Sequence, residues 1–259
     1  MFHAFKTIRR PTLARWLSAS AALSLMLARP AAAAENALSE PTAPAAANTP
    51  APNPAGAWVE LFNGRNLEGW EPHSGKAEYR VEDGCIVGRT VAGTGNSFLC
   101  TRNTYGDFIL EFEFLVPQEM NSGVQFRSEF FREATTREIN GKMRKFAADR
   151  VHGYQYEIDP SARAYTGGIY DEARRGWMAE LKNNEPARRA FKQGEWNHGR
   201  IECRGDHLQT WINDVKAADL HDGLTPRGII ALQVHSIGDG TQRKPGSEIR
   251  WRHLRLKEL

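Results

Sequence analysis

Three short runs of the sequence carry polar or charged side chains at alternate positions, with apolar residues between them. Side chains at alternate positions of a β-strand lie on the same face. If the three runs are strands of one sheet, these side chains line one surface, and such a mixture of amides, carboxylates, a guanidinium and an imidazole is typical of a sugar-binding face. The residues are Gln125 and Arg127 in 123–128, Gln155, Glu157 and Asp159 in 154–159, and Gln233 and His235 in 228–235.

The same residues could instead be ordinary solvent-facing positions of an exposed sheet. Their grouping favours a site, because exposed strands usually carry Thr, Lys and Ser, whereas amides and carboxylates recur here beside Tyr and Trp. The aromatic residues have two interpretations as well, because rings in a sandwich are more often core residues than platforms on which a sugar stacks. The possible platforms are Tyr165, Tyr170, Trp177, Trp196 and Trp211.

Glu157 and Asp159 allow two more specific hypotheses. The sequence Glu157-Ile158-Asp159 is similar to the strand motif of retaining β-glucanases, but Ser161 stands where the second Glu would be. Double displacement requires two carboxyl groups about 5–5.5 Å apart, so it is not predicted here. Alternatively, Glu157, Asp159 and His235 form a mixed carboxylate and imidazole set for a divalent metal ion, with Glu157 and His235 as the candidate ligands.

The elements that must position these side chains are predicted to be strands. Twelve short strand-like runs are separated by Asn-Gly, Asp-Gly and Gly-rich turns, which is typical of an all-β sandwich or barrel. Helical periodicity is limited to 180–191, where we expect a short surface helix. The charged segment 130–150 has no clear strand pattern and is expected to be a long excursion, either a lid over the site or a solvated loop.

The first 56 residues are predicted to lie outside the folded body. Residues 1–34 combine a basic stretch, an apolar run and an Ala-rich end, which predicts a signal peptide and export to the periplasm or the medium. Residues 35–56 are rich in Ala and Pro and are expected to form a disordered linker before a domain over 57–259. The apolar run at 16–28 is shorter than the roughly 20 residues that span a bilayer, so no membrane span is expected after signal removal.

The charge distribution argues against nucleic acid as a partner. The chain has 34 basic and 31 acidic residues, but five basic and no acidic residues lie in 1–34. The remainder therefore carries 29 basic against 31 acidic residues, a net charge of −2. Binding to phosphate backbones needs a concentrated basic surface, so we expect no nucleic-acid partner.

Three cysteines, Cys85, Cys100 and Cys203, would meet an oxidising compartment after export. Cys85 and Cys100 lie in strand-like runs joined by Gly-rich sequence, so a cross-hairpin disulfide is one expectation. The alternative is three buried thiols that pack as small apolar groups. The spacing contains no CxxC pair, so no zinc site is expected on these residues.

Several motifs follow one another along the body of the chain. They are Leu-Phe-Asn-Gly at 61–64, Leu-Glu-Gly-Trp at 67–70, Asn-Ser-Gly-Val-Gln-Phe-Arg at 121–127, Gly-Tyr-Gln at 153–155, Thr-Gly-Gly-Ile-Tyr-Asp-Glu at 166–172, Gly-Glu-Trp-Asn at 194–197, Trp-Ile-Asn at 211–213 and Ile-Ala-Leu-Gln-Val-His at 230–235. In this order they make the chain similar to the 3-keto-disaccharide hydrolase domain family over about 57–259. The resemblance implies a concanavalin A-like jelly-roll sandwich of two antiparallel sheets, with the site on the concave face.

The resemblance also implies an exported enzyme that acts on glycosides already oxidised to a ketone at C3, with a divalent metal ion as a possible helper and no organic cofactor. Such a ketone acidifies the hydrogen on C2, so a base can form an enolate that expels the aglycone from C1, after which water adds. His235 or Glu157 is the expected base, and the other of the two is expected to bind the metal or the ketone. The expected substrate-binding residues are Arg127, Gln125, Gln155, Gln233, Tyr170 and Asp159.

Two other functions fit the same residues. A sheet of amides, Arg and aromatic rings could simply hold sugars, as a lectin-like carbohydrate-binding module without catalysis. A secreted scaffold domain on a Pro and Ala-rich tether is the third hypothesis.

Overall fold

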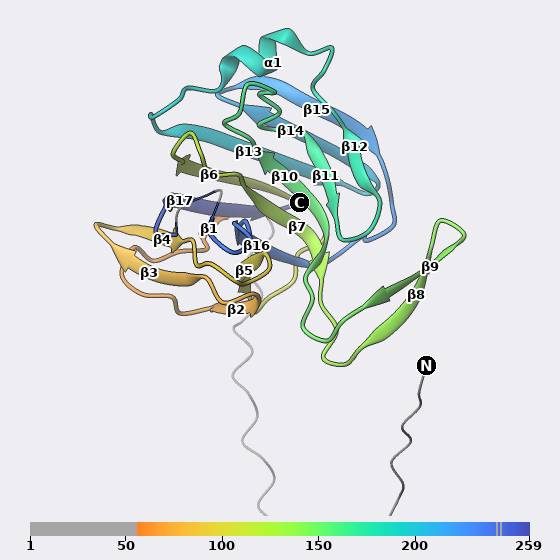
Figure 1. The fold of residues 1–259 in the computed structure, drawn as a ribbon. Coiled ribbons are helices and arrows are strands. Elements are labelled where there is room, and N and C mark those ends of the chain that lie inside the picture. The colour runs from red at the N-terminus through yellow and green to blue at the C-terminus, as the bar shows by residue number, and fades with distance from the viewer. Residues whose placement is uncertain (1–55, 242, 244) are drawn as a thin grey trace, which may run out of the picture. The chain divides into compact units, whose positions relative to one another are not determined.

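The computed structural model describes residues 56–241, 243 and 245–259 (Figure 1). The predicted signal peptide at 1–34 and, apart from Gly56, the predicted linker at 35–56 lie outside the described residues. Within the described part of the chain, no helix is both long and apolar enough to cross a membrane.

Two large antiparallel sheets make up the body of the fold (Figure 1). The first, which we name sheet A, has the strand order β15-β14-β13-β6-β17-β4-β3, with β1 paired to β17. Its strands are β1 (Trp58–Glu60), β3 (Glu78–Glu82), β4 (Cys85–Arg89), β6 (Phe108–Leu115), β13 (Asn197–Arg204), β14 (His207–Ile212), β15 (Val215–His221) and β17 (Glu248–Glu258).

The second sheet, which we name sheet B, has the strand order β12-β11-β10-β7-β16-β5-β2. Its strands are β2 (Trp70–Ser74), β5 (Ser97–Thr101), β7 (Ser122–Glu129), β10 (His152–Ile158), β11 (Ile169–Glu172), β12 (Gly176–Ala179) and β16 (Ile229–Val234). The predicted all-β sandwich of two antiparallel sheets is therefore confirmed.

The core lies between the two sheets and follows from strand alternation. In β6, Phe112 and Phe114 are fully buried while Glu111 and Glu113, which alternate with them, are only half-buried, as expected for a strand with one face on a core. Phe112 packs edge-on against Tyr156 of β10, with ring centroids 5.2 Å apart. This contact joins the two sheets at the strand that carries the predicted site residues.

The three runs that carry the predicted site residues are neighbours in sheet B. β7 lies between β10 and β16, and the residue pairs across these strands place Gln125 opposite Gln155, and Gly123 opposite both Glu157 and Gln233. The expectation that the three strands share a sheet is thus confirmed.

The charged segment 130–150 forms a β-hairpin instead of an irregular loop. β8 (Thr135–Ile139) and β9 (Lys142–Phe146) pair with each other alone and extend away from the two sheets (Figure 1). The predicted short helix is present as α1 (Glu185–Ala190), where the side chain of Asn184 accepts a hydrogen bond from the Ala187 backbone at 3.2 Å.

The three cysteines are buried free thiols. The expected cross-hairpin disulfide is wrong, because Cys85 lies on β4 of sheet A and Cys100 on β5 of sheet B, so the two strands form no hairpin. Burial raises the pKa of all three thiols, which disfavours their reactive thiolate form.

Candidate functional site

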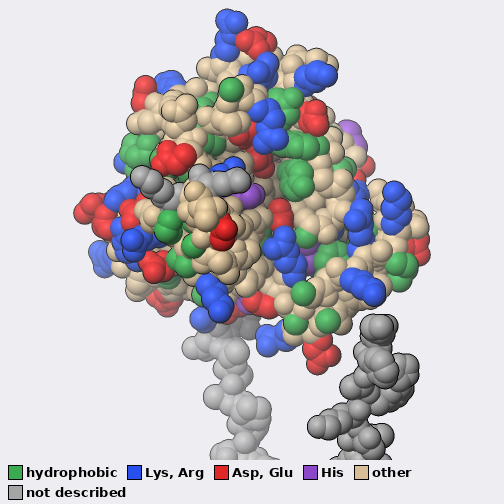
Figure 2. Space-filling view, viewed as in Figure 1, with side chains coloured by type: hydrophobic (Ala, Val, Ile, Leu, Met, Phe, Trp, Pro, Cys, Tyr) green, Lys and Arg blue, Asp and Glu red, His purple; other side chains and the backbone are tan. Residues whose placement is uncertain are grey.

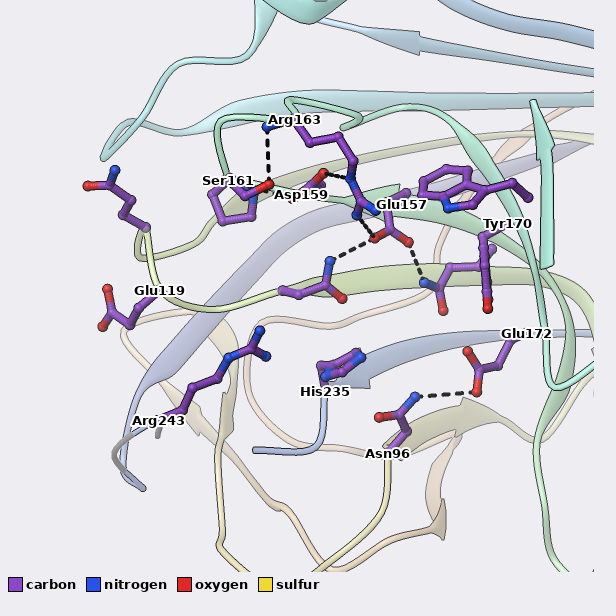
Figure 3. A pocket seen from close by; sticks show the side chains of 15 residues that line it. Asn96, Glu119, Glu157, Asp159, Ser161, Arg163, Tyr170, Glu172, His235 and Arg243 are labelled. Carbon is purple, nitrogen blue, oxygen red and sulfur yellow. Dashed lines mark hydrogen bonds and ion pairs between the residues drawn. The ribbon is translucent and has the colours of Figure 1, made fainter. Parts of the chain in front are cut away.

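A cavity of about 740 Å³ opens on sheet B. Its wall takes side chains from β10, β11 and β12, from the segments that precede β5 and β7, and from those that follow β10 and β16 (Figure 3). This volume is within the range of about 300–1,000 Å³ that is usual for small-molecule sites. None of the residues 130–150 lines the cavity, so the hairpin is not a lid in this conformation.

Glu157 is the most perturbed acid in this cavity. The residue is 5% exposed, and its two side-chain oxygens accept hydrogen bonds from Asn121 Nδ2 at 2.7 Å and from Gln155 Nε2 at 2.8 Å. Burial raises the pKa of Glu157 to about 7, although the two amide donors and Arg163 act in the opposite direction. At neutral pH this carboxyl group can therefore either give or take a proton.

His235 points toward the same cavity from the end of β16 (Figure 3). Its Nδ1 lies 2.8 Å from the Ser236 carbonyl oxygen, so Nδ1 must carry the proton that this contact needs. Burial lowers the pKa of His235 from its usual value of 6.5. At neutral pH the ring is then uncharged and Nε2, which has no partner among the described residues, is a proton acceptor.

Asp159 does not face the cavity as a free carboxylate. One oxygen accepts a hydrogen bond from Arg163 Nε at 2.7 Å and the other from the Ser161 backbone at 3.2 Å. Although burial opposes it, these bonds lower the pKa of Asp159. Arg163 also places Nη2 3.7 Å from Glu157 Oε1, so Asp159 positions the one cation that contacts Glu157 among the residues that the structure describes.

Tyr170 and Trp177 form the aromatic part of the wall. Their rings meet edge to face at 5.3 Å between centroids, and Arg163 lies over the Trp177 ring at 5.0 Å. Both rings are half-buried and both line the cavity, so their exposed parts could contact a sugar.

Gln155 lines the cavity, but Gln125 and Gln233 do not. These two amides are fully buried, and both donate to Gln155 Oε1, from Gln125 Nε2 at 2.5 Å and from Gln233 Nε2 at 2.9 Å. They lie on the predicted face of the sheet, yet their expected role as direct sugar contacts is not supported by this position.

Arg127 does not line the cavity, and its position does not support its prediction as a sugar-binding residue. Across this stretch β7 has one residue more than each neighbouring strand, and Arg127 takes a positive φ of 44° at this β-bulge. A bulge reverses the alternation of side chains beyond it. The guanidinium consequently bonds to the segments next to β6 and β13 of sheet A, at Gly106 O (2.8 Å), Gly205 O (2.6 Å) and Asp107 Oδ1 (2.8 Å).

The sequence prediction missed Asn121 and Arg163, and it named Trp177 only as one of five possible stacking platforms. Asn121 precedes β7 and was available in the motif at 121–127, but such an Asn-Ser-Gly sequence is usually a turn signal. Arg163 and Trp177 come from a turn and an edge strand, where spacing along the chain does not show which residues reach the cavity.

The side chains on the viewed face of the molecule do not form a patch of one charge. Acidic and basic residues are interspersed over it (Figure 2). This face therefore lacks the concentrated basic surface that nucleic-acid binding needs.

The predicted metal ligands, Glu157 and His235, do not form a metal-binding group with a third residue. Among residues 56–241, 243 and 245–259, no three His, Cys, Asp or Glu side chains are arranged to hold a metal ion. Protein sites for zinc usually provide three or four such ligands, and both oxygens of Glu157 already accept amide hydrogen bonds. The donor set does not fit a divalent ion, so we derive no step through one.

The sequence of residues 57–257 matches the family described as the 3-keto-alpha-glucoside-1,2-lyase-like domain. The chain belongs to this family. No curated protein matches the chain. A carbohydrate ligand fits both the family and a cavity lined by amides, carboxylates and aromatic rings.

Solved structures share the fold of this 3-keto-alpha-glucoside-1,2-lyase-like domain. A candidate glycosyl hydrolase from Parabacteroides distasonis is 17% identical, with a TM-score of 0.51 over 78% of this chain and 94% of that one. A protein of unknown function with a galectin-like fold from Bacillus subtilis is 10% identical, with a TM-score of 0.54 over 78% of this chain and 98% of that one. At these identities the likeness shows the jelly-roll fold alone.

Proposed function

We propose that the protein cleaves glycosides that carry a ketone at C3, by elimination across C1 and C2, with His235 as the base and Glu157 as the acid. The observation that carries this proposal is that one cavity holds an uncharged imidazole with Nε2 unpaired and a carboxyl group with a pKa of about 7. Environments that shift two pKa values in opposite directions mark the acid and base of a site.

The protonation states of this pair are the reverse of the ordinary ones. An unperturbed Glu loses its proton well below the pKa of a His. Here burial raises the pKa of Glu157 to about 7 and lowers that of His235 below 6.5. Just below neutral pH, a neutral His235 therefore coexists with a largely protonated Glu157.

Elimination from a 3-keto-glycoside uses both groups in these states. His235 Nε2 takes the proton from C2, and the electron pair of the C2–H bond enters an enolate with the C3 ketone. The enolate then forms the C1=C2 bond and expels the aglycone oxygen from C1, while Glu157 gives that oxygen its proton. Addition of water across C1=C2 yields the free 3-keto sugar, with oxygen bonded to C1 and a proton returned to C2. The family's description as a 1,2-lyase-like domain supports this chemistry.

The rest of the wall provides groups for holding the sugar. Arg163 and Tyr170 are the hydrogen-bond donors beside Glu157 that can face a developing enolate oxygen. Trp177 offers an apolar surface next to them. Export to the periplasm or the medium, proposed from the composition of 1–34, would bring this site to glycosides outside the cytoplasm.

The test is to incubate the purified protein with a chromogenic 3-keto-glucoside and, separately, with its unoxidised parent. Release from the keto form alone is expected, and His235→Ala should abolish it while leaving the melting temperature within a few degrees. Release from the parent glycoside, or undiminished release by His235→Ala, contradicts the proposal. Saturable sugar binding without release from either compound would identify the protein as a carbohydrate-binding module instead.

A further inference from the structure

We infer that Gln125 and Gln233, which lie outside the cavity, are positioning residues that hold the Gln155 amide with its NH2 group toward Glu157. The inference rests on the proposed function, because Glu157 is the acid of that reaction. It assigns the buried amides a role that is distinct from sugar binding.

Gln155 receives hydrogen bonds on one end of its amide and donates on the other. Its Oε1 accepts from Gln125 Nε2 and Gln233 Nε2, and its Nε2 donates to Glu157 Oε2 at 2.8 Å. Ser128 Oγ donates to Gln125 Oε1 at 2.8 Å, which leaves the NH2 group of Gln125 for Gln155. The hydrogen bonds thus run in one direction, from Ser128 through two amides to the carboxyl group.

The orientation of Gln155 matters because an amide has two ends of nearly equal size and opposite polarity. With its two ends exchanged, Gln155 would turn its carbonyl oxygen toward Glu157 and its NH2 group toward two other NH2 groups. The contact between NH2 groups would be repulsive whatever the charge on Glu157, and the contact with Glu157 would become repulsive once its proton is lost. Little water can compensate, because the three glutamines are at most 2% exposed. Two donors on Oε1 therefore favour one orientation more strongly than either alone.

Gly123 provides the space for this arrangement. A Cβ atom at position 123 would lie 2.5 Å from Gln155 Cδ and 2.8 Å from Gln155 Nε2. Gly123 is paired with Glu157 on one side and with Gln233 on the other, so the Gln155 side chain lies across β7 between them. The absence of a side chain at position 123 thus leaves room for this amide against the backbone of β7.

The oriented NH2 group has its largest effect when Glu157 loses its proton. As the proton moves to the aglycone oxygen, negative charge develops on Glu157, and the NH2 groups of Gln155 and Asn121 are already directed at its two oxygens. Donors that face a developing charge act mainly on the transition state. Their contribution must therefore depend on how much the leaving group needs an acid.

The test compares Gln125→Met, Gln233→Met and the double variant on two 3-keto-glucosides, one with an alkyl aglycone and one with a 4-nitrophenyl aglycone. With the alkyl aglycone, each single variant should lower kcat about 3-fold and the double variant about 100-fold, because either amide alone still orients Gln155. With 4-nitrophenol, which leaves without an acid, the double variant should lower kcat less than about 3-fold. The matched control, Gln209→Met on the outer face of sheet A, should change neither.

A purely structural role for the two glutamines would lower kcat equally for both substrates, and that result would overturn the inference. Should the double variant fail to fold, a second measurement uses proteins in which Gln125 and Gln233 are both kept. The NMR signals of the Gln155 side-chain amide, assigned by their loss in Gln155→Leu, should shift strongly on Glu157→Gln. No shift would show that the NH2 group does not face Glu157. This result is independent of cleavage, whereas a wild-type protein that cleaves no 3-keto-glycoside would contradict the proposed function.

Discussion

The outer faces of the two sheets both carry glutamates, but in opposite electrostatic environments. Glu111 on β6 of sheet A accepts hydrogen bonds from Arg200 at 2.9 Å and from Arg255 at 2.7 Å. Burial opposes its ionisation, but the two guanidinium groups outweigh this effect and lower its pKa. Glu157 on β10 of sheet B has two amides as its close partners and a pKa raised to about 7.

The comparison shows what turns a polar sheet face into a site. Both strands alternate apolar and polar residues, so their patterns alone are equivalent. Sheet A pairs its acids with Arg and leaves them ionised, which is a solvated, structural arrangement. Sheet B surrounds Glu157 with amides in a walled cavity. These neutral donors do not offset the cost of ionising a buried carboxyl group, so its pKa stays raised.

The largest expected effect is a difference in kcat between variants of Glu157 and Glu111. With an alkyl 3-keto-glucoside, Glu157→Gln should lower kcat by about 10²–10⁴-fold, because general acid catalysis of the leaving group is lost. Glu111→Gln should leave kcat within about 2-fold. Steady-state kinetics of both variants check this, and equal losses would show that the two faces do not differ in function.

The pH dependence of kcat/KM sharpens the comparison. It should be bell-shaped, falling below the lowered pKa of His235 as the base becomes protonated, and falling above about 7 as Glu157 loses its proton. Asp159, Arg163 and Tyr170 are the charged or titratable groups around Glu157, and none changes ionisation in this range. Glu157→Gln should abolish the alkaline limb, and a profile that keeps rising above pH 8 would contradict the assignment.

Replacement of Arg127 tests whether this residue stabilises the fold or contacts the substrate. Arg127→Met should lower the free energy of unfolding by about 3 kcal/mol, because it removes a fully buried cation that bonds to two carbonyls and Asp107. Chemical denaturation measures this loss. Folded Arg127→Met should retain wild-type KM, whereas a raised KM would restore Arg127 to the sugar-binding residues.

Glu157→Gln and Glu111→Gln should change the free energy of unfolding in opposite directions. The raised pKa of Glu157 means that the folded state binds this proton more tightly than the unfolded state, so its destabilising effect is absent below pH 4.5 and complete above about 7. At pH 8, Glu157→Gln should therefore raise the free energy of unfolding by about 1 kcal/mol. Glu111→Gln should lower it by at most about 1 kcal/mol, and less at high salt. Denaturation curves at pH 5 and pH 8 distinguish these effects.

Removal of metal should have the smallest effect. Because Glu157 and His235 have no third ligand among the described residues, EDTA should leave kcat within about 1.5-fold. Loss of activity with EDTA and its recovery with a divalent ion would instead support the metal expected from the family resemblance.

Strand alternation predicted much of this arrangement. It placed the three glutamines and Glu157 on one face, because their strands pair in sheet B without a shift between Gln125 and Gln155. It failed at Arg127, because the bulge in β7 adds a residue that no glycine or proline marks in the sequence.

Other parts of the site depend on tertiary contacts that spacing does not encode. Arg163 reaches Glu157 from a turn that is positioned by Asp159, and Ser236 fixes the His235 ring through a backbone carbonyl. The separation of Gln125 and Gln233 from the cavity likewise follows from the Gln155 side chain, which lies over Gly123. Sequence alternation identified the face, but not which of its side chains reach the cavity.

The most direct measurement uses a 3-keto-glucoside that carries deuterium at C2, with the protein and with buffer alone. Elimination requires that the C2–D bond break, so we expect a slower release of the aglycone than from the protium compound. The sugar product should have lost its deuterium to the solvent. Cleavage with no isotope effect on release and with the deuterium fully retained at C2 would show direct displacement at C1 and contradict the account.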